Sequence, residues 1–283
     1  MLSAGIALSM ASGVLLESDR TSVPYATIAV DGKSPQEVAT AIMDKIGSQG
    51  ESGGSGKVVT VTGLSGVGKG TTVNELKGML LEARANGDGG GKVMCWSNGN
   101  IFRSLTMLLS LYMEANNLTD VQDAISGAGS SELKKEIMSM IKFEKNSRGD
   151  FDTHIVGLGV DYWVKDIETT VLKGPLVSGK IPTVAKSTQG EVVKFVRGAV
   201  ESLTKEAGFD VIVEGRDETV DFIESSNRFT LVMKDGSVIG MRRAAQRLAG
   251  EVVKGGGWEG AEDAAVIELL KKALEKVVGG SSS

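Results

Sequence analysis

The sequence predicts an α/β fold, in which a parallel sheet carries helices on both faces. From residue 57 onwards, short segments rich in β-branched residues alternate with longer segments whose apolar residues recur at helical spacing. A glycine-rich loop separates the first such strand from the first such helix. Of the 283 residues, 41% are hydrophobic, which is enough for a sizeable core. Alternation of this kind is typical of a parallel sheet.

Residues 1–56 are predicted to form an N-terminal extension. Residues 1–16 are small and apolar but lack the basic start of a signal peptide, so we expect a packed or frayed segment in a cytoplasmic protein. A targeting remnant is the alternative, and it would place the protein in an organelle stroma or matrix. Residues 25–30 predict a strand and residues 34–46 a helix, which Ser34 caps and Glu37 completes as a capping box. The Gly/Ser-rich composition of residues 48–56 predicts a linker.

Residues 57–260 predict the main domain, and residues 261–283 a C-terminal helix and tail. The expected strands are Val58–Thr62, Val93–Trp96, Asp210–Glu214 and Phe229–Met233. Helices are expected after the glycine-rich loop and at Ile101–Ala115, Gln189–Ala207, about 238–253 and about 262–278. Residues from about 117 to 190 break this rhythm and predict an inserted subdomain, with short strands around Thr153–Val156 and Tyr162–Val164. The last helix has an apolar stripe, which we expect to pack against the body.

Composition excludes several classes of function. The net charge of −5 leaves no basic surface for nucleic acid or an anionic membrane as the main partner. No segment is long and apolar enough to span a bilayer. The single cysteine, Cys95, excludes an internal disulfide, and its place in a predicted strand indicates a packed thiol. The single histidine, His154, cannot support a histidine-based metal site, and we predict no metal ligands of the protein's own.

The glycine-rich loop at residues 63–71, GLSGVGKGT, has the pattern of a phosphate-binding P-loop. Glycines let successive backbone N–H groups point inward at phosphate oxygens, and the following helix adds its partial positive charge. Lys69 supplies a cation for the β- and γ-phosphates. The residues predicted to hold ATP, with Mg²⁺, are Gly63, Ser65, Gly66, Gly68, Lys69, Gly70, Thr71 and Thr72.

Two further polar segments follow predicted strands. Residues 97–105 contain Asn98, Gly99, Phe102 and Arg103, and residues 214–217 read Glu-Gly-Arg-Asp. Since ligands of parallel sheets bind beyond the carboxyl ends of the strands, we expect both segments to face the same cleft as the P-loop.

The order and spacing of these three segments resemble the bacterial-type cytidylate kinase (CMP/dCMP kinase) family, over roughly residues 57 to 250. The resemblance implies a P-loop NTPase sheet in which the insert at about 117–190 binds the acceptor. It also implies that Arg103, Arg197 and Arg216 hold the acceptor monophosphate and that Asp217 bonds its sugar or base. Arg243 matches part of the family's arginine-rich helix near the donor phosphates. The family then continues into an arginine-containing lid and a last strand, whereas this chain has no arginine beyond residue 247.

The resemblance implies transfer of the ATP γ-phosphoryl group to a nucleoside monophosphate, CMP or dCMP. Lys69, Arg103, Arg216 and Arg243 are then the catalytic residues, while Asn98, Gly99, Phe102, Arg197 and Asp217 join them in binding substrate. Two alternatives stay open. One is a kinase-like structural or regulatory subunit of a larger protein assembly, which binds nucleotide with little transfer. The other is a small-molecule kinase on the same scaffold.

Overall fold

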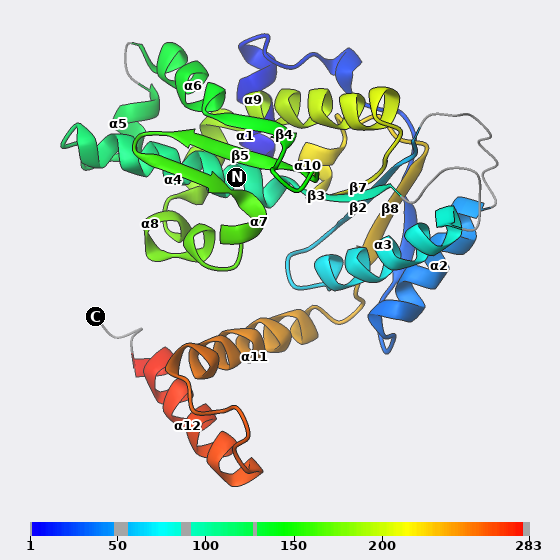
Figure 1. The fold of residues 1–283 in the computed structure, drawn as a ribbon, viewed down its shortest axis with the longest axis vertical. Helices are drawn as coiled ribbons and strands as arrows, with labels where there is room; N and C mark the ends of the chain where they lie inside the picture. The colour runs from blue at the N-terminus through cyan, green and yellow to red at the C-terminus, as the bar shows by residue number, and fades with distance from the viewer. Residues whose placement is uncertain (1, 48–55, 86–91, 127–128, 280–283) are drawn as a thin grey trace.

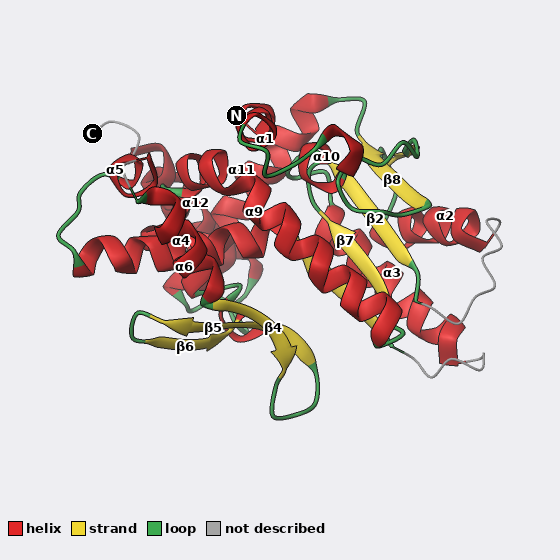
Figure 2. Ribbon diagram, turned by 90° about the horizontal axis from the view of Figure 1, so that it is seen from above, coloured by secondary structure: helices red, strands yellow, loops and turns green. Residues whose placement is uncertain are grey.

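A computed structural model describes residues 2–47, 56–85, 92–126 and 129–279 of the chain. Its main sheet has five parallel strands in the order β1-β8-β2-β7-β3 (Figures 1 and 2). The strands are β1 (Ala26–Ala29), β2 (Val58–Gly63), β3 (Val93–Ser97), β7 (Asp210–Glu214) and β8 (Asn227–Val232). The prediction of an α/β fold with a parallel sheet is therefore confirmed, and each strand expected in this sheet is present.

Helices cover both faces of this sheet. One face carries α2 (Pro35–Gly47) and α3 (Lys69–Ala85), and the other α1 (Leu2–Ala11), α4 (Asn98–Ala115), α9 (Ile181–Glu201) and α10 (Asp217–Val220). The alternation of side chains along a strand supplies both cores. In β7, Ile212 packs on the side of α2 and α3, whereas Val211 and Val213 pack on the side of α4 and α9.

The N-terminal extension belongs to the same sheet as the P-loop strand. Strand β1 pairs in parallel with β8 at the sheet edge, with Ala26 opposite Phe229. Helix α2 then packs on α3, and the predicted capping box at its start is present, because Ser34 and Glu37 each accept a hydrogen bond from the other's backbone N–H. Helix α1 packs along α9. The predicted linker at 48–56 lies outside the described residues except for Gly56.

The insert between α4 and α9 contains a separate antiparallel sheet of order β4-β5-β6 (Figure 2). Its elements are α5 (Val121–Ser126), α6 (Ser130–Ser139), β4 (Ile141–Lys145), β5 (Phe151–Gly157), β6 (Val160–Trp163), α7 (Val164–Ile167) and α8 (Pro175–Ser178). Trp96 at the end of β3 packs against Phe143 of β4, with ring centroids 5.0 Å apart. Both predicted short strands are present, but β4 was not predicted.

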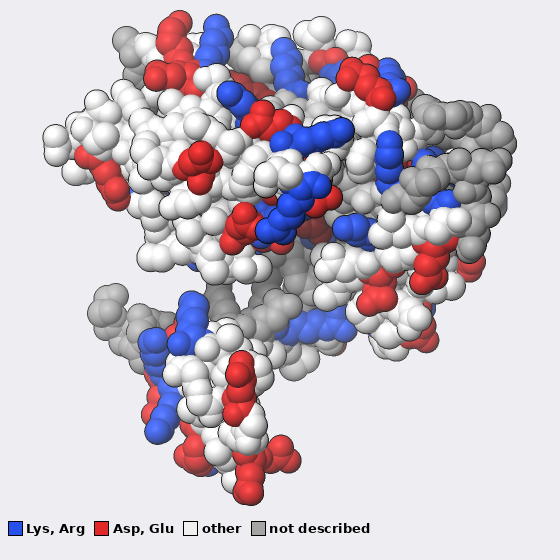
Figure 3. All heavy atoms as spheres, viewed as in Figure 1, with Lys and Arg blue, Asp and Glu red and all other residues white. Residues whose placement is uncertain are grey.

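The expectation that the last helix packs against the body is wrong. Helix α12 (Asp263–Gly279) packs against α11 (Gly236–Gly255), and this hairpin stands off from the body in Figures 1 and 3. The apolar residues of α12 lie largely in solvent, since Ile267 is 51% and Leu274 49% exposed. An ion pair of 2.7 Å between Lys276 and Glu251 joins the two helices.

On the face shown in Figure 3, acidic and basic side chains are interspersed, and neither sign of charge forms a large continuous patch. Within the described ranges, no helix combines the length and apolar character needed to cross a membrane.

Candidate functional site

The P-loop lies where β2 ends and α3 begins. Gly63, Gly66 and Gly68 have φ angles of 135°, 89° and 104°, in the region that favours glycine. At Gly63 there is also no room for a side chain, because a Cβ would lie 2.5 Å from the carbonyl oxygen of Leu231 in β8. The loop therefore has a tightly curled backbone that depends on its glycines.

Lys69 is the first residue of α3, and its side chain curls back over the loop. Its Nζ donates hydrogen bonds to the carbonyl oxygens of Gly63 (2.8 Å) and Leu64 (3.1 Å). Thr71 donates to the Gly68 carbonyl (2.8 Å), whereas the side chain of Thr72 is buried. The ammonium group thus lies at the mouth of the loop, as a phosphate-binding lysine requires.

The 97–105 segment follows β3 and starts α4, and β3 is separated from β2 by the single strand β7. Arg103 Nη1 donates to Asn100 Oδ1 (3.0 Å), and its guanidinium crosses Gly99, where a Cβ would lie 3.2 Å from Nη1. Burial lowers the pKa of the Arg103 guanidinium, while the carboxylates of Glu214 and Glu168 act in the opposite direction. Phe102 is 6% exposed and belongs to the core that α4 and α9 form with the insert.

The 214–217 segment ends β7, the strand between β2 and β3. Glu214 stands opposite Val61 of β2 and Ser97 of β3, so it joins the P-loop strand to the strand before Arg103. Its Oε2 lies 3.8 Å from where a Cβ on Gly70 would be, which directs the carboxylate to the start of α3. Glu214 lies in the predicted 214–217 segment but was not predicted as a site residue, although its place at a strand end was a usable signal.

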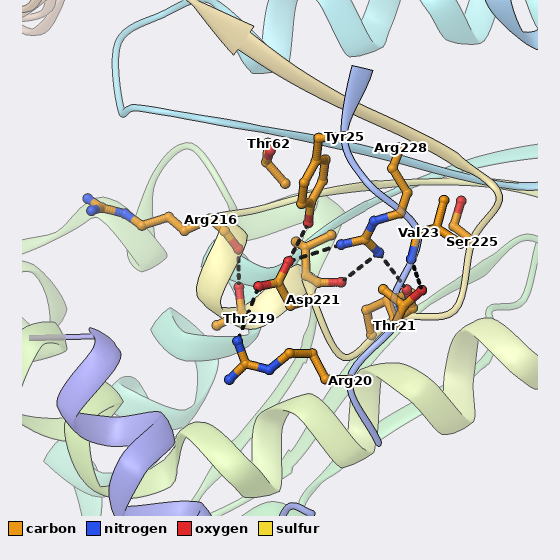
Figure 4. A network of polar contacts seen from close by, with 12 residues as sticks. Arg20, Thr21, Val23, Tyr25, Thr62, Arg216, Thr219, Asp221, Ser225 and Arg228 are labelled. Carbon is orange, nitrogen blue, oxygen red and sulfur yellow. Dashed lines mark hydrogen bonds and ion pairs between the residues drawn. The ribbon is translucent and has the colours of Figure 1, made fainter. Parts of the chain in front are cut away.

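Arg216 and Asp217 start the short helix α10, and both are exposed. In Figure 4 the Arg216 side chain extends away from the polar network of Asp221 and Arg228, while its carbonyl accepts from Thr219. The guanidinium is thus available to a ligand at this edge of the sheet.

Asn98 links the 97–105 and 214–217 segments. Its side chain is 2% exposed, and a Cβ on Gly215 would lie 3.2 Å from its Nδ2. Neither its amide nitrogen nor its amide oxygen has a hydrogen-bond partner within the described part of the chain. A buried amide left in this state is unusual and favours a site that a polar ligand or water completes.

One predicted site residue, Arg197, is not brought to this edge, and the structure does not test a second, Arg243. Arg197 lies one turn before the end of α9, where it pairs with Asp19 at 2.9 Å and lowers the pKa of that carboxyl. It lines a cavity of about 850 Å³ with Lys57 and Val58 at the opposite, amino edge of the sheet. The cause is topological, since a helix that precedes a parallel strand ends near that strand's start. The side chain of Arg243 in α11 lies outside the described residues.

Other reactive side chains lie apart from this edge or are buried. Burial raises the pKa of the Cys95 thiol to about 11, as expected for a packed cysteine. In the part of the chain that the structure describes, no group of three His, Cys, Asp or Glu residues could hold a metal ion by itself.

In comparisons with known proteins, no family model and no curated protein matches this chain.

Proposed function

We propose that this chain transfers the γ-phosphoryl group of ATP to a nucleoside monophosphate, CMP or dCMP. The observation that carries the proposal is the arrangement of three segments at one edge of the sheet. The P-loop follows β2, Glu214 ends the adjacent strand β7, and Arg103 follows β3, the next strand along. Phosphoryl transfer needs donor and acceptor phosphates side by side, with positive charge around them.

On the donor side, the loop amides and Lys69 would hold the triphosphate. Lys69 Nζ would exchange its contacts with the Gly63 and Leu64 carbonyls for phosphate oxygens. The curled loop and the carboxylate of Glu214 fit Mg·ATP, and Mg²⁺ when bound neutralises charge on the β- and γ-phosphates. Glu214 is suited to hold that ion, directly or through water, because it faces the first turn of α3.

On the acceptor side, Arg103 and Arg216 would bind the monophosphate from separate segments. Each supplies a planar, two-pronged donor that matches a phosphate group. Their charges would offset repulsion between the acceptor and the triphosphate. Asp217, one residue beyond Arg216, would bond the sugar or base, as in the family that the sequence resembles.

A kinase-like structural or regulatory subunit remains the second candidate. The α11–α12 hairpin favours it, because this region supplies no arginine beyond residue 247 and exposes apolar side chains. Such a subunit would bind nucleotide without rapid transfer. A small-molecule kinase differs from the nucleoside monophosphate kinase in its acceptor and from the subunit in carrying out transfer.

A coupled assay of ATP consumption across all nucleoside monophosphates separates these functions. Transfer to CMP or dCMP that disappears in Lys69→Ala supports the proposal. The matched control is Lys77→Ala on the same helix α3, which is expected to leave turnover unchanged. Calorimetry should show weaker Mg·ATP binding to Lys69→Ala alone. Unchanged ATP affinity and turnover in this variant would refute the donor site.

The acceptor site is tested by Arg103→Ala. Loss of a charge-assisted contact costs about 1.5–3 kcal/mol, which is roughly tenfold or more in affinity. CMP binding should weaken by this amount while ATP binding is kept. Equal loss for both ligands would indicate misfolding, and no loss for either would remove Arg103 from the site.

A further inference from the structure

We propose that Glu168 is a positioning residue that orients Arg103 through the side chain of Asn100. This inference rests on the proposed function, in which Arg103 binds the acceptor phosphate. Glu168 belongs to the insert and follows α7, whereas Asn100 and Arg103 lie in the first turns of α4. The contact therefore connects the insert to the phosphate-binding edge of the main sheet.

Two hydrogen bonds define this relay of three side chains. Arg103 Nη1 donates to Asn100 Oδ1 at 3.0 Å, and Asn100 Nδ2 donates to a carboxylate oxygen of Glu168 at 2.8 Å. The two outer groups have fixed roles, because a guanidinium can only donate hydrogen bonds and an ionised carboxylate can only accept them. The amide of Asn100 is therefore fixed in one orientation, because the flipped amide would face a donor with a donor and an acceptor with an acceptor.

Packing within the insert fixes the position of the helix that precedes Glu168. Val164 and Ile167 of α7 are buried in the core at 5% and 6% exposure. The backbone N–H of Lys165 also donates to Asp152 of β5 at 3.1 Å, which ties α7 to the antiparallel sheet. The backbone of Glu168, which directly follows α7, is consequently positioned by the packing of this helix, in addition to the hydrogen bond that its side chain makes.

The relay also limits the freedom of the guanidinium. An arginine side chain has many rotamers, and a phosphate-binding arginine that is already held in place loses less conformational entropy on binding. Arg103 is half-buried and packs across Gly99. Without Glu168, Asn100 loses the partner that fixes its amide, and Arg103 gains alternative orientations. The expected result is weaker acceptor binding with an intact donor site.

A double-mutant cycle on CMP affinity tests the inference. Glu168→Ala should weaken CMP binding by roughly twofold to 150-fold, the range usual for residues coupled in one hydrogen-bond network, and leave ATP binding unchanged. In the Arg103→Ala background, the same change should have no further effect. Glu168→Gln keeps an acceptor oxygen for Asn100 and should restore most of the affinity. The matched control is Glu132→Gln, an exposed carboxylate on α6.

A second measurement needs no ligand. Nitrogen-15 relaxation of the Arg103 Nε–Hε group should report an ordered guanidinium in the free protein and a more mobile one in Glu168→Ala. If Arg103→Ala weakens CMP binding but Glu168→Ala does not, the positioning role is refuted and the proposed function stands. An equal effect of Glu168→Ala in both backgrounds would also refute it. If the parent protein does not bind CMP, the proposed function fails, and an unchanged Arg103 order in Glu168→Ala would then overturn the relay as well.

Discussion

Replacing Asp221 by alanine is expected to destabilise the protein more than replacing Arg228 by methionine, although the two residues form one ion pair. Arg228 Nη2 lies 3.0 Å from Asp221 Oδ1, and the same oxygen accepts from the Tyr25 hydroxyl at 2.9 Å (Figure 4). The guanidinium also lies over the Tyr25 ring, 4.1 Å from its centroid. The network thus attaches the segment before β1 to the body.

The difference follows from the burial of the two partners. The Arg228 side chain is 1% exposed, whereas that of Asp221 is 23% exposed. Without Asp221, the buried guanidinium keeps the Tyr25 ring and carbonyl partners such as Ile223 (3.1 Å) but has no anionic partner among the described residues. The cost should approach roughly 3–5 kcal/mol, which is typical of a broken buried pair. Without Arg228, the carboxylate keeps the Tyr25 hydroxyl, the guanidinium of Arg20 at 3.7 Å and its partial exposure to solvent, so about 1–3 kcal/mol is expected.

Urea unfolding followed by circular dichroism measures both free energies of unfolding. The double variant Asp221→Ala/Arg228→Met should cost less than the sum of the single variants, because neither charge is then left alone. Arg20→Met is the matched control, since Arg20 is 38% exposed and should contribute about 0–1 kcal/mol. A larger loss for Arg228→Met than for Asp221→Ala would refute the argument from burial.

Three further predictions concern pH, packing and rate. Burial alone would lower the pKa of His154, but hydrogen bonds to Asp161 (2.7 Å) and Glu144 (2.5 Å) outweigh it and raise the pKa. A pKa raised on folding stabilises the protein below the unfolded value of about 6.5, and this contribution is lost as the pH rises through the folded pKa. Urea midpoints across this range should therefore fall with pH, and a His154→Gln variant that keeps the same slope would contradict the assignment. Gly215→Ala should destabilise by about 1–3 kcal/mol, because its Cβ would lie 2.7 Å from Val220 Cγ2; a thermal melt equal to that of the parent would show that the site relaxes freely. The rate constant kcat for CMP should fall below the about 1–100 s⁻¹ usual for kinases, since the chain has no arginine beyond residue 247; stopped assays that give a value within that range would contradict this.

Local signals in the sequence were enough for the strands of the main sheet and for the curled glycine-rich loop after β2. The run from Val58 to Thr62 is β-branched throughout. Three of the glycines that follow have the positive φ angles that a tightly curled backbone requires. In contrast, β4 has the sequence IKFEK, which is short and has Lys and Glu, both depleted in strands, at three of its five positions. It becomes a strand because β5 pairs with it and Phe143 packs on Trp96, and neither condition is local.

The composition of the site was less predictable than its location. Glycine patterns and strand ends indicated the correct edge of the sheet for Lys69, Arg103 and Arg216. Arg197 was assigned to the acceptor site by the resemblance alone, and it lies near the end of α9 that is at the opposite edge of the sheet. The Asn100–Glu168 bond joins residues 68 positions apart, and only the folded insert brings them together.

The pairing of β1 with β8 has a consequence for synthesis of the chain on the ribosome. Strand β1 emerges early, but its partner residues follow about 200 positions later, with Ala26 opposite Phe229. At about 5–20 residues per second, the wait lasts roughly 10–40 s. During that interval β1 and the amphipathic helix α2 have no β8 to pair with, and their apolar face is exposed to chaperones and to other nascent chains. Completion of the sheet is therefore a late event, which occurs only after residues 227–232 have left the exit tunnel.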